Sequence, residues 1–219
     1  MNVIVFAKKK HGLGAVTAFL KRHYEHVCVF TGTRADAFPL KAYRLRCDIC
    51  ISYMSPWIIP QKFLSTVKKF AINFHPGTPD YRGIGCTNFA IYDNVTRYGV
   101  TAHLMTSRVD SGPIVSVKYF PVSSEDSLVD VTRKCYELIP KQFREVFRHY
   151  IRHGELPRAR ETWGRRLYTR KELDELCRIH ESMDAGEVGR RVRATDFPDM
   201  PKAYMEAFGF RFEFKGRVL

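Results

Sequence analysis

An asparagine and a histidine stand two residues apart at the end of a short apolar run. Asn73 and His75 occur in Ala-Ile-Asn-Phe-His, directly before a Pro-Gly pair. Side chains two positions apart in a strand point to the same face, so the amide and the imidazole would converge. Such a pair can bind a developing oxyanion and move a proton. The same two side chains would serve equally well to satisfy backbone groups in a turn.

An aspartate further along the chain is a candidate third member of this site. Asp110 precedes Ser-Gly-Pro and lies between two strand-like segments. Its carboxylate would orient His75 or form a charge pair with it. Aspartate before Ser-Gly is also a common turn residue, so both roles stay open. His103, in the strand-like segment before Asp110, faces either the core, where we expect it, or the site.

The segments that must position these residues alternate between strand-like and helix-like patterns. Apolar runs predict strands at residues 3–6, 27–30, 48–52, 71–74, 100–105 and 114–120. Amphipathic stretches predict helices at residues 15–22, 60–69, 86–93 and 124–153. Such alternation implies parallel pairing, and continuous apolar strands imply a sheet covered on both faces. The expected fold class is α/β, a mostly parallel sheet flanked by helices, which binds ligands at the carboxyl ends of its strands.

A charged linker with Pro157, at residues 154–162, divides the chain into two parts. We expect residues 1–155 to form the main domain and residues 156–219 a C-terminal tail. The tail patterns predict helices at residues 169–179 and 185–192, then a strand or hairpin at 208–214. Four phenylalanines alternate in that last segment and would share one face. They would pack either on the tail's own helices or across a homodimer interface.

The chain is basic, and the excess charge is uneven. The formal net charge is +13, and residues 1–70 hold 12 basic and 3 acidic side chains. This balance suits an anionic ligand such as a nucleic acid, a phosphorylated metabolite or a polycarboxylate. A basic, solvated surface accounts for it equally well.

Composition excludes several other classes of protein. Hydrophobic residues make up 45% of the chain, which argues against intrinsic disorder. No apolar run approaches the ~20 residues that span a bilayer. The N-terminus lacks the charge-before-apolar order of a signal peptide. We therefore expect a cytoplasmic protein with reduced cysteines and no membrane contact.

Two short patterns imitate known ligand sites. Cys47 and Cys50 have CxxC spacing, but no second Cys/His pair follows at zinc-ribbon spacing, so we expect no metal. Gly12 and Gly14 follow the first predicted strand. They lack the third glycine and the acidic residue of a dinucleotide site, and we interpret them as turn glycines.

The segments around His75 and Asp110 together resemble a known family. The pattern Asn-x-His-Pro…Tyr-Arg-Gly, followed about thirty residues later by Asp-x-Gly-x-Ile, is similar to that of the folate-dependent formyltransferases. Residues 53–60 resemble that family's folate-flanking loop, and residues 167–173 and 191–198 resemble tails of its sugar-modifying members. The resemblance implies a Rossmann-like core in which residues 1–155 are the formyltransferase catalytic domain.

The resemblance also implies an enzyme whose catalytic residues are Asn73, His75 and Asp110. The donor would be 10-formyltetrahydrofolate and the acceptor a primary amine, with no metal. The implied folate contacts are Met54, Ser55, Trp57, Ile58, Met105, Thr106, Ser107, Arg108 and Val109. The implied acceptor contacts are Pro76, Gly77, Tyr81, Arg82 and Gly83. Core packing would explain Trp57 and Ile58 equally well, and Arg82 would serve equally to pin its loop.

The fold does not choose the acceptor, and three hypotheses compete. The sequence His-Pro-Gly-Thr-Pro at residues 75–79, rather than the His-Ser-Leu-Leu-Pro of the tRNA and purine branches, favours a nucleotide-linked amino sugar. A dTDP- or GDP-4-amino-4,6-dideoxyhexose for a surface glycan such as O-antigen is an example. Formylation of methionyl-tRNA is the second hypothesis, although residues 156–219 are too few for the β-barrel of that branch. A non-catalytic, basic nucleic-acid-binding module is the third, and it gives no reason for all three polar residues. The expected partners are thus folate and a nucleotide sugar, not nucleic acid.

Overall fold

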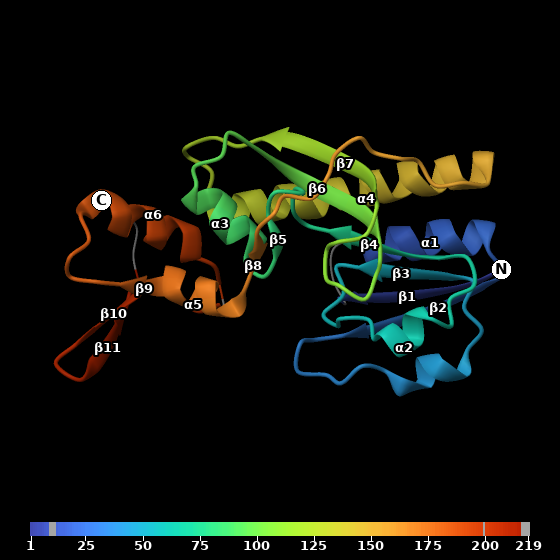
Figure 1. Cartoon of the computed structure of the whole chain (residues 1–219), viewed down its shortest axis with the longest axis horizontal. Coiled ribbons are helices and arrows are strands. Elements are labelled where there is room, and N and C mark those ends of the chain that lie inside the picture. The colour runs from blue at the N-terminus through green and yellow to red at the C-terminus, as the bar shows by residue number, and fades with distance from the viewer. Residues whose placement is uncertain (9–11, 199, 216–219) are drawn as a thin grey trace. The chain divides into compact units, whose positions relative to one another are not determined.

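The computed structural model describes residues 1–8, 12–198 and 200–215, which fold into two compact units (Figure 1). The first unit contains residues 1–79, 99–118 and 135–163. The second unit contains residues 80–98, 119–134 and 164–219. Each unit is made of three separate segments of the chain. The expected domain boundary after residue 155 stays a prediction.

A six-stranded sheet with the strand order β2-β1-β3-β4-β6-β7 organises the first unit. Its strands are β1 (Asn2–Lys8), β2 (His26–Gly32), β3 (Ile49–Tyr53), β4 (Phe70–His75), β6 (Arg97–Leu104) and β7 (Ile114–Pro121). The neighbours β2-β1-β3-β4 pair in parallel, whereas β4 and β6 pair antiparallel. The predicted α/β class with a mostly parallel sheet is confirmed. The ends of β6 and β7 belong to the second unit.

Helices cover both faces of this sheet, as the uninterrupted apolar strands predict. Figure 1 shows α1 (Leu13–His23) and α2 (Gln61–Leu64) on opposite sides of it. The long helix α4 (Leu128–His153) packs Phe143 against Phe74 of β4, with ring centroids 5.2 Å apart. On the other face, Phe63 of α2 meets Phe6 of β1 at 5.3 Å. The short 3-10 helix η1 (Leu40–Arg44) supplies Ala42 to the same cluster.

The helix expected at residues 60–69 is much shorter than predicted. α2 ends at Leu64, and turns carry the chain from there to β4. The backbone N–H groups of Lys68 and Lys69 donate to the carbonyl oxygens of Cys47 and Asp48. The end of this segment is therefore hydrogen-bonded to the residues before β3. Its amphipathic pattern arises from packing against the sheet and not from a continuous helix.

The second unit is built from short elements. They are β5 (Arg82–Gly83), α3 (Cys86–Tyr92), β8 (Leu167–Tyr168), α5 (Arg170–Cys177), β9 (Arg178–Ile179), α6 (Ala185–Thr195), β10 (Tyr204–Ala207) and β11 (Phe210–Glu213). β5 pairs with β8, and β9, β10 and β11 form a separate three-stranded sheet. Thr169 and Glu172 form a capping box that starts α5. The Asn88 amide on α3 donates to the carbonyl of Ala194 on α6.

The terminal hairpin does not bury its phenylalanines. Phe208, Phe210 and Phe212 are 95%, 69% and 53% exposed. These three rings therefore do not pack on the helices of the tail, which was one of the two expectations for them. Pairing across a homodimer interface stays a prediction.

Gly83 is held where a side chain cannot fit. Its φ is 94°, and an added Cβ would lie 2.4 Å from the Tyr168 carbonyl oxygen. We expect Gly83→Ala to lower the free energy of unfolding by about 1–3 kcal/mol, because the backbone must shift or remain strained. Gly189 on α6 has open space around it and is the control. Gly189→Ala should raise stability by about 0.5–1 kcal/mol in urea unfolding. Equal effects of the two changes would refute this account.

The Glu187 carboxylate on α6 gives the second unit a pH-dependent contact. It accepts hydrogen bonds from Arg191 Nε at 2.7 Å and from the Tyr92 hydroxyl at 2.8 Å. The hydrogen bond from Arg191 is the main reason why its pKa falls to about 2. A lowered folded-state pKa contributes stability above the ordinary glutamate pKa, and this contribution is lost as the pH falls towards 2.

Glu187→Gln should therefore cost about 1–2 kcal/mol at neutral pH. It should also flatten the decline of the unfolding free energy with acidification. Thermal and urea unfolding at a series of pH values measure both effects. Glu181→Gln, at an exposed position of the same unit, serves as the control. The prediction fails if the Glu187 variant and the control lose stability with acid in parallel.

Candidate active site

Four polar side chains meet on one face of the central sheet in the first unit. Asn73 and His75 lie on β4, His103 on β6, and Asp110 in the loop between β6 and β7. The His103 Nε2 atom is 3.1 Å from the Asn73 Nδ2 atom and 3.2 Å from the Asp110 Oδ1 atom. The Asp110 Oδ2 atom is 3.6 Å from the His75 Nδ1 atom. Both imidazoles and the carboxylate are buried.

The antiparallel pairing of β4 with β6 explains why these side chains converge. Asn73 is directly opposite His103 in the register, and His75 is opposite Thr101. Paired residues of neighbouring strands project to the same side of the sheet. Phe74, of opposite parity on β4, packs under α4 instead. The polar residues therefore occupy the face opposite to α4.

The loop after β6 is constrained so that Asp110 returns to the histidines. Asp110 itself has a φ of 43°, in the left-handed region that few residues other than glycine adopt. Gly112 lies so close to β6 that an added Cβ would be 2.0 Å from the Leu104 carbonyl oxygen. The Thr106 and Ser111 hydroxyl oxygens are 2.8 Å apart within the same loop. This turn therefore requires a glycine two residues after the aspartate.

The hydrogen bonds of His103 restrict where its protons are. Its Nδ1 atom is 2.8 Å from the Leu104 carbonyl oxygen. A carbonyl only accepts, so Nδ1 carries a proton and donates. Nε2 then lies between the Asn73 amide nitrogen at 3.1 Å, which can donate to it, and the Asp110 carboxylate oxygen at 3.2 Å, which can only accept from it. The His103 imidazole thus joins Asn73 and Asp110 in one polar cluster.

His103 is the cluster residue for which we preferred a place in the core to a place in the site. It is indeed only 2% exposed. However, the side chains that surround its imidazole include the polar groups Asn73 and Asp110. The signal was present in the sequence, since Thr101 and His103 are two apart and must share a face. What the sequence does not reveal is that this face is the one that carries Asn73.

The first expected folate segment leaves β3, which borders β4 in the sheet. Met54 is buried with a φ of 50°. The Ser55 hydroxyl accepts from the Trp57 backbone N–H and donates to the Trp57 carbonyl. The Trp57 ring packs edge-on against Phe6, and its Nε1 donates to the Asp36 carbonyl. Trp57 thus has the packing role that we weighed for it, whereas Ile58 is 76% exposed.

The second expected folate segment, residues 105–109, follows β6 on the other side of β4. The Met105 backbone N–H donates to the Ala71 carbonyl, and its side chain packs with the cluster around Phe6. The Thr106 hydroxyl caps the turn by accepting from the Arg108 N–H. Thr106, Ser107, Arg108 and Val109 are exposed. Both segments thus belong to the same unit as the polar cluster.

The expected acceptor residues are divided between the two units. Pro76 and Gly77 belong to the first, where the Thr101 hydroxyl donates to the Gly77 carbonyl at 2.7 Å. Tyr81, Arg82 and Gly83 belong to the second. There the Tyr81 hydroxyl donates to Asp93, and burial beside Asp93 raises the pKa of Tyr81. Arg82 donates to the carbonyls of Arg165 and Arg166, so it does pin its loop.

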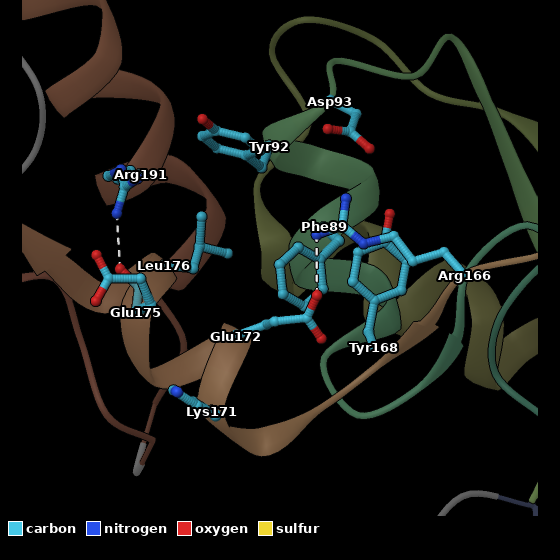
Figure 2. A pocket seen from close by; sticks show the side chains of 10 residues that line it. All are labelled: Phe89, Tyr92, Asp93, Arg166, Tyr168, Lys171, Glu172, Glu175, Leu176 and Arg191. Carbon is cyan, nitrogen blue, oxygen red and sulfur yellow. Dashed lines mark hydrogen bonds and ion pairs between the residues drawn. The ribbon is translucent and has the colours of Figure 1, made fainter.

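The second unit also contains a surface pocket of about 510 Å³ (Figure 2). Phe89 and Tyr168 stack there with centroids 4.0 Å apart, and Arg166 lies over the Tyr168 ring. Figure 2 shows Arg166 joined to Glu172, and Arg191 reaching the Glu175 backbone. The other lining residues are Tyr92, Asp93, Lys171 and Leu176. The lining holds three cations and three carboxylates, so its formal charges balance. Its aromatic surface suits a planar ligand.

Within residues 1–8, 12–198 and 200–215, no group of three His, Cys, Asp or Glu side chains could hold a metal ion. Cys47 and Cys50 are buried in the cluster around Phe6. No helix in the described part of the chain is both long and apolar enough to cross a membrane.

The fold and site together define an α/β protein with a buried polar cluster of two histidines, an asparagine and an aspartate at the central sheet. Residues 3–147 match the formyl transferase family model, and the chain therefore belongs to the formyl transferase family. This is a family of transferase enzymes. A methionyl-tRNA formyltransferase of Listeria monocytogenes is 32% identical over 84 residues, which are 38% of this chain and 27% of that protein. The chain thus matches about a quarter of the length of that curated relative.

Solved structures with the same fold include sugar N-formyltransferases. A 4-N formyltransferase from Francisella tularensis is 19% identical, with a TM-score of 0.80 over 100% of this chain and 98% of that one. An N-formyltransferase from Helicobacter canadensis, in complex with folinic acid and dTDP-3-aminofucose, is 19% identical. Its TM-score is 0.72 over 89% of this chain and 80% of that one. These similarities establish the fold.

A second family model, of MerR helix-turn-helix regulators, matches residues 144–187. In a helix-turn-helix, a turn of about 3–4 residues joins the two helices. Here residues 154–169 separate α4 from α5, and they include β8. The geometry of this segment is therefore not that of a helix-turn-helix.

Proposed function

We propose that the protein transfers a formyl group from 10-formyltetrahydrofolate to the primary amine of a nucleotide-linked amino sugar. A dTDP- or GDP-4-amino-4,6-dideoxyhexose is the kind of acceptor that we infer. The observation that carries the proposal is the meeting of Asn73, His75 and Asp110 on one buried face, in a chain of the formyl transferase family.

These residues have the chemistry that the reaction needs. The amine nitrogen attacks the formyl carbon, and negative charge develops on the formyl oxygen. The Asn73 amide donates a hydrogen bond to that oxygen. His75 takes the proton that the amine loses, since imidazole changes protonation near neutral pH. The bond from the formyl carbon to N10 of the folate then breaks, and the proton passes to that nitrogen. Asp110 compensates the charge on the histidines.

A folate donor is supported by the segments that flank β4. The exposed Ile58 lies in one segment, and Thr106, Ser107, Arg108 and Val109 lie in the other. Both segments belong to the unit that holds the polar cluster. The structural neighbour from Helicobacter canadensis is in complex with folinic acid, a formylated folate.

A nucleotide-linked acceptor is supported by two observations. The same neighbour binds dTDP-3-aminofucose. The pocket of the second unit offers stacked aromatic rings and the exposed cation Lys171, which suit a base and a phosphate. A role in surface glycan synthesis, a cytoplasmic location and a homodimer complete the proposal. Methionyl-tRNA is the alternative acceptor, and a non-catalytic nucleic-acid-binding module is the alternative to an enzyme.

A mass-spectrometric transfer assay tests the proposal. Purified protein and 10-formyltetrahydrofolate are incubated with a set of nucleotide-linked amino sugars and, separately, with methionyl-tRNA. We expect one sugar to gain the mass of a formyl group in place of hydrogen. Formylation of the tRNA alone would refute the proposed sugar acceptor but would support formyl transfer as the reaction. No product on either acceptor would overturn the proposed reaction.

Substitutions in the polar cluster should abolish transfer without unfolding the protein. Asn73→Ala should lower kcat by about 10²–10³, because one donor to the formyl oxygen is lost. His75→Ala should remove most of the turnover. His26→Ala, at an exposed histidine of β2, is the control and should leave turnover unchanged. Unchanged turnover in both cluster variants, with folding verified by circular dichroism, would refute the assigned roles.

The exposed Ile58 should contribute to folate binding. Ile58→Ser should raise the dissociation constant for folinic acid about tenfold, since burial of an isoleucine is worth about 1.5–3 kcal/mol. Leu40 on η1 is an equally exposed aliphatic residue of the same unit, 74% against 76%, and Leu40→Ser is the matched control. Calorimetric titration measures both variants. If their affinities equal that of the unchanged protein, the segment after β3 is not a folate contact.

A further inference from the structure

A tryptophan from the segment after α4 contacts the polar cluster from outside the two strands that carry it. This segment returns along the first unit, where the Ala159 backbone N–H donates to the Ile114 carbonyl at 3.2 Å. It ends at Trp163, whose indole Nε1 donates to the Gly112 carbonyl at 2.7 Å. Trp163 is thereby attached to the turn that carries Asp110.

The indole also lies against both imidazoles. Its ring is 4.9 Å from the His103 ring, centroid to centroid, at an interplanar angle of 84°. The His75 ring is 6.4 Å away at 70°. These edge-to-face arrangements are favourable aromatic contacts. One side chain therefore contacts three parts of the cluster: the β4 histidine, the β6 histidine and the turn of the aspartate.

We propose that Trp163 is a positioning residue for the two histidines and for Asp110. The inference rests on the proposed function, because it assigns Trp163 a role in that same site. His103 is held within its ring plane by Leu104, Asp110 and Asn73. None of these contacts restrains the ring faces. The near-perpendicular indole packs against His103 and excludes water there, while its N–H holds the Gly112 carbonyl.

The two contributions of Trp163 can be separated by substitution. Trp163→Phe keeps an aromatic ring but loses the N–H donor, so the Gly112 carbonyl loses its partner. Trp163→Ala loses both the donor and the ring. A role limited to the hydrogen bond would make the two variants equal. A role that includes holding the imidazoles would make the alanine variant much worse.

The first test needs no catalytic activity. The chain has two tryptophans, so Trp57→Phe leaves Trp163 as the only one. A protonated imidazole in contact with an indole quenches its fluorescence. The titratable groups around Trp163 are His103 from β6, His75 from β4 and Asp110 from the turn. We expect Trp163 emission to change in a step with pH, because both imidazoles lie against the indole. Replacing both His75 and His103 by Gln in the same background should remove that step. A pH-independent emission, or a step that persists without both imidazoles, would overturn the contact.

The second test separates positioning from substrate binding. We expect Trp163→Ala to lower kcat by about 10–100-fold, as misplaced catalytic groups do, with KM for the folate changed less than about twofold. Trp163→Phe should recover most of this loss and shift the pH profile of kcat. Tyr24→Phe is the control, because it removes a buried hydroxyl of the first unit that lies outside the site. A rise in KM at unchanged kcat, or wild-type kcat in both Trp163 variants, would refute the proposal.

The two tests fail independently. If the unsubstituted protein transfers no formyl group, the proposed function falls, and the fluorescence titration still decides whether Trp163 senses the histidines. If transfer occurs and the titration shows no coupling, the function stands and the role of Trp163 falls. Thermal unfolding of each variant excludes loss of the fold as the cause.

Discussion

A carboxylate buried between two imidazoles is the interaction on which the site depends. Asp110 is 6% exposed and lies within 3.6 Å of both histidines. A buried carboxylate is costly unless it is paired or hydrogen-bonded, and the two imidazoles are the groups placed to partner it. That requirement fixes the rest of the local structure. β6 must pair antiparallel with β4 to bring His103 opposite Asn73, and the loop must turn sharply to return Asp110 to them.

Local backbone strain occurs at the same places. Met54 and Asp110 are two of the four non-glycine residues with positive φ in the described part of the chain. Met54 directly follows β3, and Asp110 lies in the loop that follows β6, the two strands that flank β4. Such conformations cost of order 1–3 kcal/mol each and persist where surrounding packing imposes them. Near these two positions, Trp57 and Met105 pack against the cluster that contains Phe6 and Phe63. Packing therefore fixes part of both segments that we expect to contact folate.

The parts of this arrangement that the sequence predicted are those with local signals. Continuous apolar runs marked the strands, and period two placed Asn73 and His75 on one face. The neighbours of His103 were not predictable, because they depend on the register of β6 with β4, which pairs residues about thirty positions apart. The helix at residues 60–69 was overextended because Lys68 and Lys69 bond to the residues before β3. Trp163 gave no signal, since a residue in an irregular charged segment has no periodicity to interpret.

In the proposed function, the acceptor must be chosen by residues whose side chains are not already engaged in structural contacts. Arg82 is engaged by backbone carbonyls, and Gly83 is pressed against Tyr168, so both have structural roles in the second unit. In the pocket, Glu172 pairs with Arg166 and Glu187 with Arg191, which reduces the attraction for anions there. The overall charge of +13 therefore raises the encounter rate of any anionic substrate without selecting one. Selection must come from short-range contacts, and exposed Lys171 beside the stacked rings is the lining cation best placed to make them.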